Sequence, residues 1–245
     1  MDIETTGNAN IGGAVGYGSG DLSALRVRAN VKASCSAEAD LSAIQEQERD
    51  YKVLLAVGGA AGCLYGNADN VRVNVIRVAA ESAYGATDLY VLSGGLAGQL
   101  GSAQNVEITG TGSVSASGGR ALAAGAVALL SSDISCAVVS QVTLSASNVG
   151  GVVGVLSTGE SGSASLVVCN VDVPAGQGGL IWLLAEDATV SASRYYADAV
   201  LAGGVSSAQE AQFDQVSKLG TAAEVYAEFD GTVWTVDGES IPMLK

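Results

Sequence analysis

The sequence predicts an all-β fold, a right-handed parallel β-helix (β-solenoid) with a small C-terminal cap. Three observations predict it: a Gly-containing phrase that recurs along the chain, short apolar and alternating segments after each copy, and a composition rich in Gly and small aliphatic residues. Repetition at tens of residues indicates a stack of similar units. Right-handedness follows from the general handedness of connections between parallel strands.

The recurring phrase is a Gly pair, two small apolar residues and a further Gly. The clearest copies are at 12–16, 58–62 and 94–98, weaker or later copies are at 124–128, 150–154 and 178–182, and another Gly pair is Gly203-Gly204. The second positions of the first six copies are separated by 46, 36, 30, 26 and 28 residues. Because these gaps shrink toward the C-terminus, we expect the C-terminal half to be the more regular part of the stack.

Each unit has two predicted parts. The first is the Gly pair and a short apolar strand buried on both faces, as in 152–156 and 180–184. The second begins with a small polar turn residue and continues as an alternating, half-buried strand, as in 25–32 and 71–75. These turn residues are Asp21, Asn70, Asn105 and Asp133. Gly at the corners serves a positive φ or a close approach of neighbouring backbones.

The region 36–56 breaks the repeat. It contains good helix formers and mostly acidic charges, with Leu41 and Ile44 as the large apolar residues of its helix-forming stretch, 37–49. We therefore expect a loop or a short helical insertion there, leaving the stack between two units.

The composition limits the function. The net charge is −14, which argues against nucleic acid and anionic membranes as partners. The chain contains no His, the commonest general base and zinc ligand, and no apolar segment of membrane-spanning length. The residues after Met1 lack the pattern of a signal peptide, so a complete gene product would be cytoplasmic, whereas a piece of a larger protein need not be.

The four cysteines are Cys35, Cys63, Cys136 and Cys169. None belongs to a Cys-x-x-Cys pair, so neither a zinc site nor a redox motif is predicted. We interpret them as small buried apolar residues, while their even number leaves disulfides open. We predict no catalytic, cofactor-binding or metal-binding residues, and no cofactor.

Cleavage of a polysaccharide is the enzymatic alternative, because parallel β-helices with that activity exist. It requires paired carboxylates or a carboxylate cluster with a metal. Asp21, Asp69 and Asp133 are the candidates, although a role in turn formation explains them better.

Two further groups of side chains offer binding alternatives. A basic stripe would hold an acidic sugar and an aromatic platform would stack on one, whereas solvated charges and packing at unit edges are the commoner explanations. The basic residues are Arg26, Arg28, Arg72 and Arg77, and the aromatic ones are Tyr17, Tyr65, Tyr90, Tyr195 and Tyr196. We expect Trp182 in the core and Trp234 in the packing of the C-terminal cap.

These features together resemble the GLUG repeat of bacterial surface proteins. Gly95-Leu96-Ala97-Gly98 is the nearest copy of its core, and the tail resembles the end of such arrays. The tail segments are Arg194-Tyr195-Tyr196-Ala197-Asp198, Val233-Trp234-Thr235-Val236-Asp237-Gly238 and Ile241-Pro242-Met243-Leu244. The resemblance spans roughly residues 8–245, with three departures. Ala or Val mostly replaces the motif's Leu, two copies lack the third Gly, and Arg194 stands where Cys is usual.

The resemblance implies solenoid repeats over residues 1–205 and a capping segment over 206–245. It implies a non-enzymatic structural or adhesive module of a secreted or cell-surface bacterial protein, located outside the cell as part of a larger polypeptide. The partners it implies are a host surface or a glycan, with no nucleic acid and no direct membrane insertion. A polysaccharide-binding or polysaccharide-cleaving β-helix is the alternative.

Overall fold

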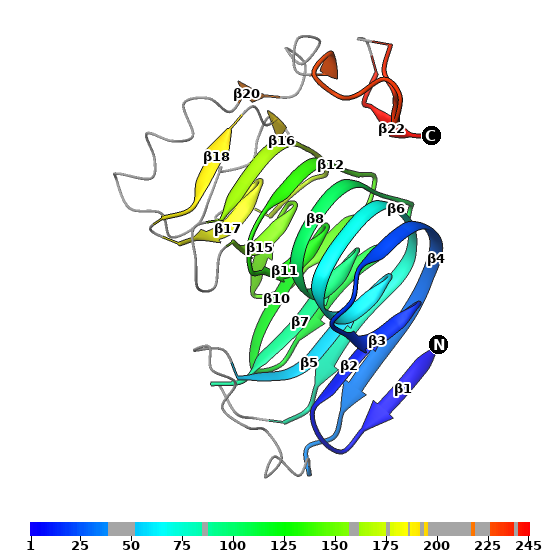
Figure 1. Ribbon diagram of the computed structural model, residues 1–245. Coiled ribbons are helices and arrows are strands. Elements are labelled where there is room, and N and C mark those ends of the chain that lie inside the picture. Colours follow the sequence, from blue (N-terminus) through cyan, green and yellow to red (C-terminus); the bar gives the residue numbers. More distant parts are fainter. Residues whose placement is uncertain are drawn as a thin grey trace.

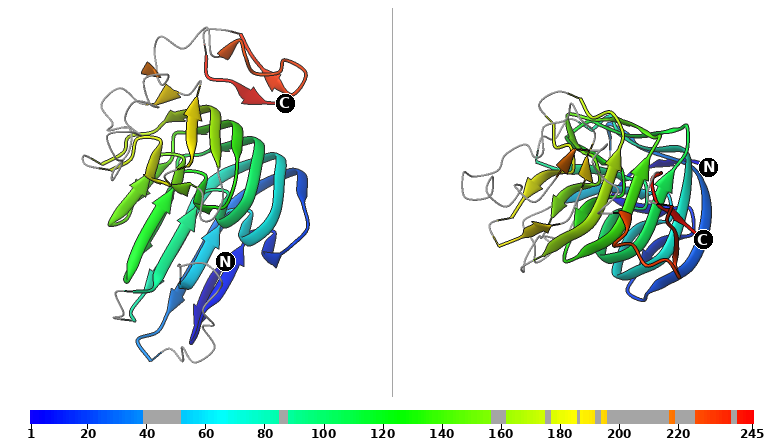
Figure 2. Two further views of the ribbon diagram at one scale, coloured as in Figure 1. Left: turned by 60° about the vertical axis from the view of Figure 1, so that its left-hand side comes forward. Right: turned by 90° about the horizontal axis from the view of Figure 1, so that it is seen from above.

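The computed structural model describes residues 1–38, 52–84, 88–156, 162–174, 177–185, 187–191, 194–195, 217–218, 226–237 and 240–245. These residues form an all-β structure dominated by parallel sheets (Figure 1). The prediction of an all-β chain with parallel pairing between repeats is therefore confirmed. Successive repeats lie side by side along the molecule in chain order (Figure 2).

One sheet is built from the strands that lead into the Gly pairs. Its order is β14-β10-β7-β5-β2, with every described pair parallel. The strands are β2 (Ala9–Gly12), β5 (Val53–Gly58), β7 (Tyr90–Gly94), β10 (Arg120–Ala124) and β14 (Asn148–Gly150). The register pairs Gly12 with Gly58, and Gly58 with Gly94. The sequence repeat and the pairing register therefore coincide.

The larger sheet contains the strands that follow the corners. The strands that begin next to a corner are β3 (Val15–Gly18), β6 (Ala61–Ser82), β8 (Ala97–Thr109), β11 (Val127–Leu130), β15 (Val153–Leu156) and β17 (Ile181–Leu184). The strands that begin farther along each unit are β4 (Leu22–Cys35), β12 (Ile134–Ser140), β16 (Ser163–Asn170), β18 (Thr189–Ser191), β19 (Arg194–Tyr195) and β20 (Ser217–Lys218). Three further strands complete the sheet: β1 (Asp2–Thr5) pairs with the end of β4, β9 (Ser113–Ser117) pairs with the end of β6, and β13 (Thr143–Ser145) pairs with β9.

Each Gly corner is a two-residue turn between the sheets. Between β5 and β6, the backbone amide of Gly59 donates to the carbonyl of Gly94 at 3.2 Å, and that of Ala60 donates to Leu96 at 2.9 Å. Among the described glycines, positive φ occurs at Gly110, Gly118 and Gly119, not at these corners. The corner glycines are therefore required by close backbone approach, and the alternative of positive φ is wrong for them.

A second corner does use positive φ, with residues other than glycine. Within β4, β6, β8, β12 and β16, one residue per strand has a φ of 50–55°. These residues occupy equivalent register positions and are Ala24, Asn70, Asn105, Cys136 and Leu166. Asn is one of the few side chains that tolerates this conformation well. Asn70 and Asn105 are therefore turn formers, as predicted.

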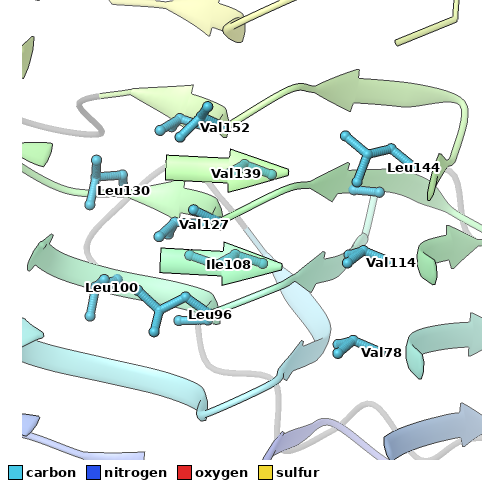
Figure 3. Close-up of a cluster of buried hydrophobic side chains, with 14 of the residues drawn as sticks. Val78, Leu96, Leu100, Ile108, Val114, Val127, Leu130, Val139, Leu144 and Val152 are labelled. Carbon is cyan, nitrogen blue, oxygen red and sulfur yellow. The ribbon is translucent and has the colours of Figure 1, made fainter. Parts of the chain in front are cut away.

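The inner strands β5, β7 and β10 of the five-stranded sheet are buried on both faces, whereas the edge strand β2 is mostly half-buried. Leu55 and Val57 belong to the main core, whereas Ala56 lies in a second cluster with Leu92 and Leu122. Within the main core, equivalent residues of successive units are stacked on one another (Figure 3). The stacked sets include Leu100 with Leu130, Ile108 with Val139, and Val114 with Leu144. The predicted burial of the strand after the Gly pair is confirmed for β15, whose four residues are all buried, whereas the two middle residues of β17 are partly exposed.

Two predictions need correction. The expected insertion over 36–56 extends too far, because Val53–Gly58 is already strand β5, whose aliphatic side chains are buried; residues 39–51 lie outside the described residues. Trp182 is not fully buried but packs, partly exposed, against the second cluster.

The C-terminal residues include an antiparallel pair, β21 (Trp234–Thr235) with β22 (Met243–Leu244). We call residues 226–237 and 240–245 the C-terminal element. The division of the chain at residue 206 remains a prediction.

Candidate functional site

Asp21 and Asp133, two of the three candidate carboxylates, do not come together. A column here means the residues that are register partners across successive units. Asp21, Asn67, Ser102 and Asp133 occupy one column, whereas Asp69 lies in another, opposite Ser23 and Gln104. Three inter-strand steps of about 4.8 Å separate Asp21 from Asp133, or roughly 14 Å. Glycoside hydrolysis uses carboxyl groups about 5–9.5 Å apart, so this pair is too distant.

The same carboxylates bind the backbone and side chains of the next unit. Oδ1 of Asp21 accepts from the Asn67 amide at 2.8 Å. Oδ1 of Asp133 accepts from both the amide and the hydroxyl of Ser163 at 2.8 Å. Oδ1 of Asp69 accepts from Nδ2 of Asn105 at 3.0 Å. Each carboxylate therefore links neighbouring units, and its local role in turn formation remains a prediction.

The basic residues do not form a free stripe. Nη2 of Arg26 donates to the backbone carbonyl of Lys245 at 2.6 Å, and Arg72 pairs with Glu107 at 2.8 Å. Arg77 pairs with Asp2 and also donates to the Asn30 side chain at 3.2 Å. Arg28 is exposed. Three of the four are thus committed to contacts within the molecule.

The C-terminal element lies on the outer side of the larger sheet, across several units (Figure 1). Its attachment is polar at the N-terminal units. The Leu244 amide donates to Oε2 of Glu107 at 2.6 Å, and Nε1 of Trp234 donates to Oδ1 of Asn105 at 3.0 Å. Glu107 is 6% exposed and is the buried charged side chain among the described residues.

The attachment is apolar farther along the stack. Trp234, Phe229, Tyr226 and Leu244 are buried against Val138 and Val168. The Phe229 and Trp234 rings meet edge to face, with centroids 5.0 Å apart. The predicted role of Trp234 in packing of the C-terminal part is confirmed.

One outward column explains this change in character. Its members are Arg26, Arg72, Glu107, Val138 and Val168, in unit order. The column thus has charged residues in the first three units and valines in the next two. The C-terminal element makes polar contacts with the charged part of the column and apolar contacts with the valines. Sequence reasoning missed Glu107; the available signal was a carboxylate between the two β-branched apolar residues Val106 and Ile108.

The tyrosines divide into exposed and buried ones. Tyr17 and Tyr65 are 62% and 43% exposed and meet edge to face at 5.8 Å. Tyr90 is buried, with its ring 5.4 Å from the Arg120 guanidinium carbon and its hydroxyl 3.2 Å from Nη1. The side chains of Tyr195 and Tyr196 lie outside the described residues. The exposed pair remains the aromatic candidate for ligand contact.

The cysteines are four free thiols at positions that the structure describes. Burial raises the pKa of Cys63 to about 11, against a smaller lowering by the Tyr65 side chain, and raises that of Cys169 to about 12. Burial also raises the pKa of Cys136, with a further contribution from Asp230. Neutral thiols of this kind are poor nucleophiles and poor metal ligands. The described residues contain no group of three or more metal-ligating side chains.

Within the described residues, no helix has the length and apolarity needed to cross a bilayer. Comparison with known proteins found no matching family model, no matching curated protein and no matching solved structure.

Proposed function

We propose that this chain is a non-enzymatic structural or adhesive module of a secreted or cell-surface bacterial protein. In this proposal each unit is one coil of a right-handed parallel β-solenoid of the GLUG type, with about six or seven coils. The module acts outside the cell, as part of a larger polypeptide. Its partners are a host surface or a glycan rather than nucleic acid or the membrane interior.

The parallel, in-register stacking at the Gly corners is the observation that supports the proposal most. Backbone amides at the five corners from Gly13-Ala14 to Gly151-Val152 donate to carbonyls of the next unit, so the stack continues through these corners without interruption. The candidate carboxylates Asp21, Asp69 and Asp133 instead accept hydrogen bonds from neighbouring units. A continuous stack of this kind suits a stiff spacer or a long binding flank.

A glycan and cell-binding assay tests the proposal. The purified chain is incubated with a broad polysaccharide panel and with host cells or matrix glycans. We expect no released product from any polysaccharide. Saturable binding supports the adhesive role, and absence of binding leaves the spacer role. Release of oligosaccharides, retained after repurification, would contradict the non-enzymatic proposal.

Polysaccharide binding is the second candidate, and the exposed Tyr17–Tyr65 pair favours it. Exposed tyrosine rings offer apolar faces beside hydroxyl groups, which suits contact with a sugar. If binding is found, we expect Tyr17→Ala with Tyr65→Ala to weaken it at least about tenfold. Met243→Ala, another exposed apolar residue on the C-terminal element, is the matched control. Equal binding by the tyrosine double variant and by Met243→Ala would show that the two tyrosines do not belong to the binding site.

A further inference from the structure

The first unit has an open edge, which we call the N-terminal edge and define as residues 9–18. In the described residues, β2 pairs only with β5 and β3 only with β6. At the corner, the amides of Gly13 and Ala14 donate to Gly59 and Ala60. Among the described residues no backbone amide donates to the carbonyl of Ala14, whereas its equivalents in the later units each accept two amides. These equivalents are Ala60, Leu96, Ala126, Val152 and Leu180. The edge therefore presents backbone groups with the pairing pattern of an inner unit.

The apolar interior is also open at this edge. Ala14 is exposed, whereas its equivalent Ala60 is fully buried. Val27 is partly exposed, whereas its register partner Val73 is fully buried. A further unit laid on this edge would bury them as the later units bury their equivalents.

The edge lacks the usual protection against pairing. Natural edge strands carry charges, Pro or bulges that prevent strand addition. Residues 9–18 read Ala-Asn-Ile-Gly-Gly-Ala-Val-Gly-Tyr-Gly, without a charged residue or a Pro. Tyr17, the most exposed large apolar residue among those described, lies on this edge.

The backbone contacts at the Gly corners indicate which partner fits the N-terminal edge. A Cβ on Gly13 would collide with the carbonyl of Gly59, one on Gly59 with that of Gly95, and one on Gly95 with that of Gly125. The same relation continues from Gly125 to Gly151 and from Gly151 to Gly179. In each case the constraint comes from the following unit. A unit laid ahead of the first one would therefore need Gly opposite the Gly13 carbonyl.

We propose that the N-terminal edge is a docking surface for one further parallel β-unit whose corner carries a Gly pair. The partner adds β-strands to β2 and β3, donates two corner amides to the carbonyl of Ala14, and covers Val15, Leu25 and Val27. The interface continues the one already present between the described units. This inference rests on the stacked-unit architecture of the proposed function.

A fusion that supplies such a unit tests the proposal. In the strand register Asp2 pairs with Lys32, Lys32 with Ala79, and Ala79 with Ser115, so Asp2 and Ser115 occupy equivalent positions. The fusion therefore carries a copy of residues 88–114 directly ahead of Asp2. This copy supplies β7, a Gly corner and β8 in the register that the first unit requires. Amide hydrogen exchange is measured over residues 9–18 of the original chain. We expect exchange there to slow by about tenfold or more, with a higher melting temperature. The matched control carries Gly95→Val in the added copy alone, and we expect no such protection.

Three outcomes would overturn the proposal. The first is equal exchange over residues 9–18 in the fusion and the unmodified chain. The second is equal protection by the Gly95→Val copy. The third is a fusion that gives no protection together with an unmodified chain that forms a dimer in light scattering, which Ala14→Lys dissociates. A second copy of the chain would then be the occupant of the N-terminal edge. If Gly151→Val destabilises the unmodified chain while the fusion fails, the docking proposal fails and the stacked architecture stands.

Discussion

At the residue scale, the corner glycines show how a neighbour's backbone selects a residue type. A Cβ on Gly151 would meet the Gly179 carbonyl and lie 2.5 Å from Sγ of Cys169. A Cβ on Gly154 would meet the Ala128 carbonyl and lie 2.8 Å from Cδ2 of Leu122. Backbone atoms cannot move aside as a flexible side chain can. The repeated Gly phrase is thus the sequence signature of unit-to-unit contact.

Gly151→Val and Gly154→Val should each destabilise the protein clearly. The overlap with packed backbone predicts a loss of about 3 kcal/mol or more, or roughly 6–12 °C in melting temperature for a chain of this size. Thermal unfolding followed by circular dichroism measures this. Gly20→Ala is the control, because a Cβ there meets nothing within 4 Å. Melting temperatures equal to that of the control would show that the corner glycines are not structural.

Cys63 and Cys169 should be unreactive in the folded protein near pH 8. Burial raises the pKa of these thiols to about 11 and about 12, so both remain protonated there. An unfolded thiol ionises near pH 8.5. Between that pH and the folded values the folded state holds more protons, so stability falls as the pH rises.

Thiol titration and urea unfolding check the cysteine prediction. We expect slow reaction of both thiols in buffer and rapid reaction in denaturant. The Cys63→Ala, Cys169→Ala double variant should lose less stability between pH 8 and pH 10 than the unmodified chain does. Rapid labelling of both residues in the folded state would contradict the burial described above.

At the element scale, the C-terminal element is held by several polar contacts and an apolar cluster. Glu107 accepts from the Leu244 amide and from Arg72, while Trp234 packs near Val138 and Val168. Removing the Glu107 carboxylate leaves Arg72 and a backbone amide without their partner. Arg72 is about one-third exposed, so water replaces part of that interaction.

Glu107→Ala should therefore cost about 2 kcal/mol and loosen the C-terminal element. In a Trp182→Phe background, the fluorescence of Trp234 reports on that element alone, because the chain has two Trp residues. We expect a red-shifted emission and a lower unfolding midpoint. Glu81→Ala, which breaks the exposed pair with Lys32, is the control and should change stability by less than about 1 kcal/mol. If the Trp234 emission maximum of Glu107→Ala is not red-shifted, the Glu107 contact does not hold the C-terminal element.

The repeat made the units, their parallel pairing and their doubly buried strands predictable from sequence. The sequence did not distinguish the position of Asp21 from that of Asn70, because both residues precede an apolar residue. In the structure, Asp21 shares a column with Asn67, whereas Asn70 has positive φ in another. The place of the C-terminal element was also not predictable, because its contacts join residues more than a hundred positions apart, such as Asn105 and Trp234. The inter-unit bonds of Asp21, Asp69 and Asp133 were not predictable either, because their partners lie 46, 36 and 30 residues away.

At the scale of the whole molecule, parallel pairing in register brings distant parts of the chain close together. The outward column of Arg28, Asn74, Thr109, Ser140 and Asn170 crosses the units. Four inter-strand steps of about 4.8 Å place the backbone of Arg28 about 19 Å from that of Asn170. The circular dichroism spectrum should correspondingly be that of a β protein, and a spectrum dominated by helix would contradict the fold.

A distance between spin labels at positions 28 and 170 tests the stacked-unit claim most directly. The labels are attached to Arg28→Cys and Asn170→Cys in a chain whose four native cysteines are replaced, after circular dichroism has shown that the fold is retained. Pulsed electron paramagnetic resonance should give a narrow distribution centred at about 20–25 Å once label length is included. A broad distribution centred beyond about 35 Å would contradict parallel stacking of the units in register.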